Sequence, residues 1–259
     1  MSHWINWFLP LGLAIFVSIL FAMEIGRRSG IHVRKQDPEG ATSGTGPVDG
    51  AIFGLMGLLI AFTFSGAASR FDARRQLIVD EANKVDTAYL RITLLPGHVQ
   101  PILQEAFRQY VDARLAIYRK LPDLAAATAE LNRANKLQQE IWAGAVAGCQ
   151  EAGSPAVMTL VLGSMNEMIN VANTRTEGSQ MHPPLVIPVM LVVLVLACSL
   201  LAGNLMAASK MRNWVHILGF AIMLSVTVLI ILDIEYPRIG AIRIDAWDRA
   251  LIQVRANMR

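Results

Sequence analysis

Charged residues and cysteines are scarce in this chain of 259 residues, and each shortage argues against a class of protein. Asp, Glu, Lys and Arg make up 17% of the residues and apolar residues 54%, whereas about a quarter of a soluble globular protein is usually charged. The formal net charge is only +3, and no basic tract alternates with aromatic residues, so nucleic acid is not an expected partner. Only Cys149 and Cys198 could pair, and Cys198 lies inside an apolar run, which argues against a disulfide framework.

Sequence motifs for catalysis are also missing. The five histidines have no metal-ligand spacing to cysteines or carboxylates. The chain has no glycine-rich dinucleotide fingerprint after a strand, no phosphate-binding loop and no nucleophile elbow. We therefore expect no enzyme activity, no catalytic residues, no metal site and no cofactor.

What the chain does have is long apolar runs, which lie at about 4–22, 50–69, 185–206 and 214–232. Each is close to the roughly 20 residues that a helix needs to cross the hydrocarbon core. The first run has no basic n-region and no small-x-small cleavage site, so we interpret it as a retained helix and not as a signal peptide. The pattern predicts an all-α integral membrane protein with four transmembrane helices in a 2+2 arrangement.

The segment between the two pairs of runs predicts a soluble helical bundle, because it shows helical periodicity and no strand-like alternation. Residues 1–69 should hold the first two spans and residues 70–182 the bundle. Residues 183–233 should hold the last two spans, and 234–259 a C-terminal tail. The connector at 30–47 is rich in Gly, Ser, Thr, Pro and charge, which is typical of an exposed loop.

The rest of the chain is organised around the second apolar run and its continuation. The apolar half ends at about Ser69, and the charged stretch RFDARRQLIVDEANKVDTAYLR follows without Pro or Gly. In that stretch Phe71, Ile78 and Val85 recur every seven positions. We expect one continuous helix that leaves the bilayer and enters the bundle.

Two faces of this helix can be told apart in its apolar half. A face of small residues would let another helix approach closely; it comprises Gly50, Gly54, Gly57, Ala61 and Ser65. Leu55, Leu58 and Phe62 fall on a neighbouring face. These large side chains could face lipid or a partner helix, or they could line a constriction in an oligomeric pore that gates by excluding water.

Several charged residues are candidates for ion pairs or for a polar vestibule. They are Arg70, Arg74, Arg75, Asp80, Glu81, Arg175, Asp233 and Glu235. Pairing along the helix or between elements is the simpler interpretation. A role of Asp233 and Glu235 in ion or proton handling is the alternative, because acids near a membrane core are often functional. For Arg175 the alternative is contact with an anion.

The charge pattern does not decide on which side of the membrane the bundle lies. Cations in the short connectors favour a cytoplasmic location for those connectors and would place the bundle outside; they are Arg27, Arg28, Arg34, Lys35, Lys210 and Arg212. The basic C-terminal tail favours the opposite orientation.

Four stretches of the sequence resemble the bacterial bestrophin-like membrane family, whose function is unknown: LLIAFTFSGAASRFDARRQLIVDEANKVDTAYLRITLLP, RQYVDARL, MNEMINVANTR and LDIEYPRIGAIRI. A more distant resemblance is to bestrophins, which are pentameric anion or cation channels. It implies four membrane helices, a helical insert between the second and third, a pore lined by the second helix, and a cytoplasmic bundle. The resemblance to the bacterial family also implies the bacterial inner (cytoplasmic) membrane as the location.

Individual positions both follow and depart from the bestrophin pattern. Phe62 stands where the innermost neck phenylalanine would fall, and Leu58 stands one turn before it. Gly54 replaces a bulky neck residue at the next turn. Arg70 and Arg75 match two of the arginines that follow the neck. The acidic run of the animal calcium clasp is absent, so calcium gating is not implied.

The predicted spans and the resemblance to bestrophins are compatible with two functions. The first is a homo-oligomeric ion channel, with a pentamer favoured, whose neck is formed by Leu55, Leu58 and Phe62 and whose partners are small ions, membrane lipid and further copies of itself. The second is a non-conducting membrane scaffold or sensor that couples the bilayer to the helical bundle. The scarcity of polar residues along the second span favours the second function.

Overall fold

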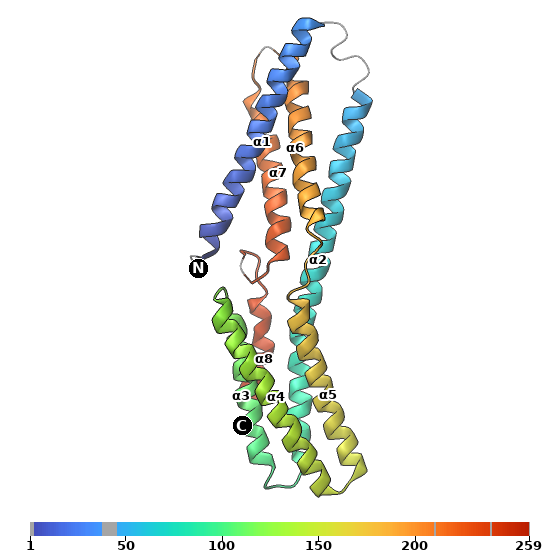
Figure 1. The fold of residues 1–259 in the computed structure, drawn as a ribbon, viewed down its shortest axis with the longest axis vertical. Coiled ribbons are helices and arrows are strands. Elements are labelled where there is room, and N and C mark those ends of the chain that lie inside the picture. Colours follow the sequence, from blue (N-terminus) through green and yellow to red (C-terminus); the bar gives the residue numbers. More distant parts are fainter. Residues whose placement is uncertain (1–2, 38–45, 210, 239, 259) are drawn as a thin grey trace. The chain divides into compact units, whose positions relative to one another are not determined.

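Helices form the regular structure throughout the described part of the chain (Figure 1). In this computed structural model the described residues are 3–37, 46–209, 211–238 and 240–258, with side chains from Phe8 onward. The chain divides into two compact units. The membrane unit comprises residues 1–70, 182–236 and 240–242, and the insert unit comprises 71–181, 237–239 and 243–259.

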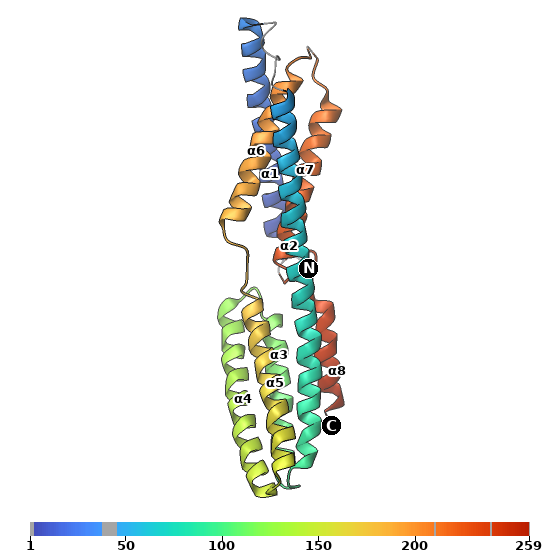
Figure 2. The same cartoon turned by 90° about the vertical axis from the view of Figure 1, so that its right-hand side faces the viewer.

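The membrane unit contains α1 (His3–Gln36), the first part of α2 (Gly46–Arg91), α6 (Val186–Met206) and α7 (Trp214–Glu235). Each of these four helices is long and apolar enough to cross a membrane. In Figures 1 and 2, α1 runs beside α6 and α7. The predicted all-α class and the 2+2 order of the spans are thus confirmed.

Close packing in the membrane unit depends on two glycines where α1 meets α6. A Cβ atom on Gly26 would overlap the backbone carbonyl of Leu200, and one on Gly203 would overlap the backbone carbonyl of Met23. Small residues at such positions let two helices approach closely in lipid, where packing replaces the hydrophobic effect as the driving force. Any larger side chain at either position would push the two backbones apart.

The predicted loop at 30–47 is wrong at its N-terminal end, because α1 continues to Gln36. Tertiary contacts explain the extra turns: Arg34 Nη1 donates to the carbonyl oxygen of Asn204 at 2.9 Å, and Gly30 lies against Ala207. The second helix begins at Gly46. Residues 38–45, which form the middle of the predicted loop, lie outside the described residues, and so does Lys210.

The insert unit is a bundle made by the rest of α2, η1 (Ile92–Leu94), α3 (Gln100–Arg119), α4 (Leu124–Ala152) and α5 (Pro155–Gly178). Figure 2 shows these helices side by side. Its core includes the fully buried Val85, Phe107, Tyr110, Ile141 and Met165. Burial of such side chains is worth about 1.5–3 kcal/mol each and is the main stabilising contribution to the bundle.

Local signals set the helix boundaries in the insert unit. The Asp123 carboxylate accepts a hydrogen bond from the Ala126 N–H at 3.0 Å and so caps α4. Gly153, with φ of 62°, ends α4 in the left-handed conformation that favours glycine. Ser154 then caps α5, whose first residue is Pro155, a residue suited to the first position of a helix.

The C-terminal tail contains helical structure that the sequence did not predict. A short turn, η2 (Asp245–Asp248), leads into α8 (Arg249–Asn257). Leu251 is fully buried in the core of the insert unit, and Arg255 forms an ion pair with Asp112 of α3 at 2.9 Å. Tertiary contacts with α3 therefore hold a helix that is too short to be stable alone.

Candidate functional site

The candidate site is the apolar half of α2, which lies within one uninterrupted helix from Gly46 to Arg91. The absence of Pro and Gly from the charged half allows the helix to continue, as the sequence predicts. In the membrane unit α2 contacts α7 through the rings of Phe53 and Phe220, 6.5 Å apart and nearly perpendicular. It contacts α6 where the Cys198 thiol lies 3.8 Å from the carbonyl oxygen of Ile52.

The large apolar side chains singled out on α2 are exposed in the single chain. Leu55, Leu58 and Phe62 are 56%, 52% and 66% exposed, respectively. In the most apolar stretch of 18 residues of α2, only 11% is buried inside the single chain. The corresponding share in the other three spans is 17–33%. Of the four spans, α2 is therefore the one that the rest of the chain covers least, and its apolar face is available to lipid or to another copy of the chain.

The face of small residues on α2 is also open. A Cβ atom on Gly50, Gly54 or Gly57 would meet no described atom within 4 Å, and Ala61 and Ser65 are exposed. Within one chain these residues do not make the close helix contact for which their spacing is suited. That contact is made instead by the glycines of α1 and α6 described above, which the sequence predictions did not include, although Ala22 and Gly30 flank Gly26, and Ser199 and Ala207 flank Gly203, at four-residue spacing.

Glu235, the last residue of α7, lies at the centre of an ion-pair cluster. Its carboxylate accepts hydrogen bonds from Arg70, from Nη2 at 2.6 Å and from Nε at 2.9 Å. His182 Nδ1 lies 3.1 Å from the same carboxylate. Because Glu235 is buried, these contacts compensate a charge that would otherwise be costly.

The Asp233 carboxylate holds the turn that follows α7. It accepts hydrogen bonds from the backbone N–H groups of Ala241 and Ile242 at 2.7 and 2.8 Å. A Cβ atom on Gly240 would overlap this carboxylate, so glycine is required where the turn approaches it. These are the contacts of a structural cap.

Glu81 lies at the centre of a buried network in the insert unit. Its side chain is fully buried and pairs with both Arg114 and Arg175. Burial alone would lower the pKa of Arg114, but the charge of Glu81 more than offsets it, and the net effect is a raised pKa. Arg114 therefore stays charged, and both guanidinium groups depend on the same carboxylate for their ion pair.

The same network continues into the C-terminal turn. Arg175 also donates to Asp248 at 3.1 Å, and Arg238 donates to Asp248 at 2.6 Å. The ring of Tyr118 is stacked by both arginines, with guanidinium carbons 4.1 and 4.4 Å from its centroid. Asp245 completes the network with a bond to Arg238 at 2.8 Å. Sequence reasoning singled out Glu81 and Arg175 but not their other partners.

The remaining charged candidates lie elsewhere on α2. Arg74 is buried and donates to the carbonyl oxygens of Gly178 and Met181 at 3.2 and 2.7 Å. Arg75 lies over the ring of Trp247, 4.5 Å from its centroid. Asp80 is partly exposed. Across the part of the chain that the structure describes, no group of three His, Cys, Asp or Glu residues is placed to hold a metal ion.

Comparisons with known proteins agree with this architecture. Residues 11–246 match the family model of the bestrophin-like domain. Two crystal structures of variants of a bacterial bestrophin homolog from Klebsiella pneumoniae match with TM-scores of 0.67 and 0.68 at 14% and 15% identity, covering 94% and 95% of this chain and 98% of each of those chains. A third structure, of a membrane protein, matches with a TM-score of 0.65 at 15% identity over 93% of this chain and 96% of that chain.

At these identities the structural matches show a shared fold, and the family match shows descent. A search of curated proteins found no match. Since the family model spans most of the sequence and four spans flank a helical insert, this multi-pass membrane protein belongs to the bestrophin-like family.

Proposed function

We propose that the protein is a homo-oligomeric ion channel in which copies of α2 surround the pore. The observation that carries this proposal is the exposed apolar face of α2, the least covered span of the single chain. One helix cannot enclose a pore, so several copies of the chain are needed. The open face of small residues on α2 suits close contact with a neighbouring subunit, and the likeness to bestrophins favours five subunits.

The neck of this pore is formed by Leu55, Leu58 and Phe62. Their spacing of three and four residues keeps them on one face of α2, over a rise of about 10 Å. A short apolar ring of this length can exclude water and so act as a gate. Small ions are the permeating species, and the bacterial cytoplasmic membrane is the proposed location.

Ion flux into liposomes tests the neck directly. The purified full-length protein is reconstituted, and flux through wild type is compared with flux through Phe62→Ala. Phe21→Ala on α1 is the matched control, because Phe21 is 65% exposed and Phe62 is 66% exposed. Widening an apolar neck should raise flux through Phe62→Ala, while Phe21→Ala should behave as wild type. Equal flux in all three folded proteins would contradict the neck assignment.

A non-conducting scaffold or sensor is the second candidate, and one observation favours it. The hydroxyl of Thr63, one of the few polar groups along the span, donates to the carbonyl oxygens of Leu59 and Ile60 at 2.8 and 3.0 Å. The single proton of this hydroxyl is thus engaged by its own helix, so the group offers a pathway only acceptor lone pairs and no donor. Absence of flux from every variant, in protein that purifies with a defined partner and forms no ring, would support this function.

A further inference from the structure

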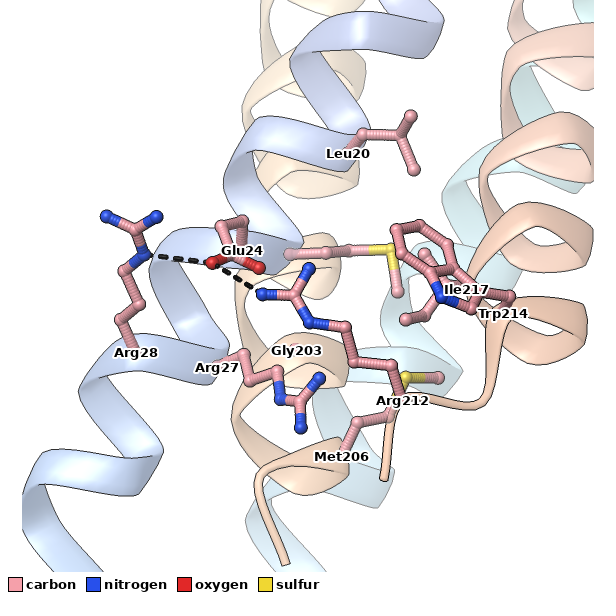
Figure 3. Close-up of a pocket in the computed structure, with 10 residues that line it drawn as sticks. Leu20, Glu24, Arg27, Arg28, Gly203, Met206, Arg212, Trp214 and Ile217 are labelled. Carbon is pink, nitrogen blue, oxygen red and sulfur yellow. Dashed lines mark hydrogen bonds and ion pairs between the residues drawn. The ribbon is translucent and has the colours of Figure 1, made fainter. Parts of the chain in front are cut away.

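The membrane unit contains a cavity that none of the functions considered above uses. Its volume is about 360 Å³, within the range of roughly 300–1,000 Å³ that is typical of small-molecule sites. It lies where α1, α6 and α7 come together beside the turn between α6 and α7 (Figure 3). In the sequence this is the point where all three apolar runs give way to polar residues, which corresponds to the level of lipid headgroups.

The polar side of the cavity carries excess positive charge. Arg27, Arg28 and Arg212 line it together with a single carboxylate, that of Glu24. Glu24 is already shared, since it accepts from Arg28 Nε at 2.9 Å and from Arg212 Nη2 at 3.2 Å (Figure 3). The formal charge of the lining is therefore three positive groups against one negative group.

Arg27 is the member of this set that needs a partner most. It is only 8% exposed, and its Nη2 donates to the carbonyl oxygen of Ser209 at 3.3 Å. Its buried Nε has no hydrogen-bond partner, and it forms no ion pair with any carboxylate among the described residues. Burial of a charge without an opposite charge is costly, and an anion in the cavity that Arg27 lines would supply the missing charge.

The rest of the cavity lining is mostly apolar. It includes Leu20, Met23, Met206, Trp214 and Ile217. Figure 3 places Trp214 and Ile217 across the cavity from Arg27. Tryptophan is enriched at the boundary between lipid and water, where one part of the ring is apolar and the other polar. A ligand that fits both sides must have an anionic group next to an apolar chain.

We propose that this cavity binds the phosphate-containing headgroup of an anionic phospholipid, with Arg27 and Arg212 on the phosphate and the start of the acyl chain against the apolar side. Basic pockets between transmembrane helices are suited to lipid headgroups, and guanidinium groups are suited to phosphate oxygens. The proposal concerns the membrane unit alone and does not depend on whether α2 lines a pore.

Native mass spectrometry of the full-length protein in detergent tests this site by counting bound lipid. Phosphatidylglycerol, phosphatidylcholine and inorganic phosphate are titrated separately, and phosphate is also added as a competitor of phosphatidylglycerol. Phosphatidylglycerol should bind saturably and about tenfold more tightly than phosphatidylcholine, because both carry an anionic phosphate but the three lining arginines would repel the choline cation. Phosphate should not displace it, because free phosphate lacks the acyl chain.

Single charge removals then locate the site. Arg27→Gln and Arg212→Gln should each weaken phosphatidylglycerol binding about tenfold. Lys35→Gln is the matched control, because it removes the same charge from the same end of α1 at an exposed position that does not line the cavity. If Arg27→Gln does not fold, Arg212→Gln suffices, since its side chain is 45% exposed and tolerates replacement.

Three results would overturn the proposal. Equal binding of both lipids to wild type would show that the site does not discriminate by headgroup charge. Equal loss of binding in Lys35→Gln and in the two arginine variants would show that the anionic lipid is attracted only by the general surface charge. Displacement of phosphatidylglycerol by inorganic phosphate at matched concentration would show that the cavity accepts a free anion and that a lipid is not its ligand.

Discussion

Replacing Glu81 with glutamine should strongly destabilise the protein, because two buried arginines share this one carboxylate. Glu81 is 0% exposed, and the side chains of its partners Arg114 and Arg175 are 3% and 4% exposed. Glutamine keeps the shape of the side chain but removes the charge. Loss of one partner from a buried ion pair costs about 3–5 kcal/mol, which for a chain of this size corresponds to a fall in melting temperature of about 6–20 °C.

The assay is thermal unfolding of the full-length protein in detergent, followed by loss of the folded peak in size-exclusion chromatography. Glu167→Gln is the matched control, because Glu167 is also a glutamate in a close ion pair, with Lys84 at 2.6 Å, but its side chain is 57% exposed. Solvent and salt already screen that pair, so its loss should change the melting temperature little.

A double variant tests the coupling within the network. Glu81→Gln combined with Arg114→Gln removes one negative and one positive charge together, so it should lose less stability than the sum of the two single changes. A melting temperature for Glu81→Gln equal to that for Glu167→Gln would refute the reasoning, because it would show that Glu81 is solvated in the folded protein.

Three further predictions concern single positions. Gly26→Ala should abolish the folded peak or lower its melting temperature because its Cβ overlaps the α6 backbone, whereas Gly219→Ala, with no atom within 4 Å of its Cβ, should be tolerated. Gly240→Ala should likewise lower the melting temperature, since the new methyl group would displace the Asp233 carboxylate from the turn. Asp123→Ala removes the N-cap of α4 and should cost about 1 kcal/mol, measured by the same thermal assay.

The number and order of the spans could be predicted from the sequence because a long apolar run gives a strong signal. The continuity of α2 was predictable for a similar reason, since no helix-breaking residue interrupts its charged half. The end of α1 was not predictable from composition. The stretch around Gly30 has the composition of a loop, but contact with the end of α6 and the hydrogen bond from Arg34 keep it helical.

Pairing between distant residues was the least predictable part of the candidate sites. Glu81 and Arg175 could be singled out as charged residues in helices, but their contact joins positions 94 residues apart. Arg114 and Arg238 have no local pattern that separates them from surface arginines. The glycines illustrate the same limit. Small residues at four-residue spacing occur on α2 and also around Gly26 and Gly203, but within the chain the close helix contact is made by Gly26 and Gly203.

If Phe62 faces the axis of a ring of identical chains, as we propose, cross-linking at this position should join neighbouring copies. Phe62→Cys and, as a control, Phe21→Cys are treated in membranes with a short bis-maleimide. The native Cys149 and Cys198 are both buried, and burial raises the pKa of the Cys149 thiol, so both should react slowly. Covalent dimers are expected for Phe62→Cys alone, in protein whose native mass spectrum shows a ring of more than two chains. Monomeric protein, or equal cross-linking at both positions, would contradict the proposal.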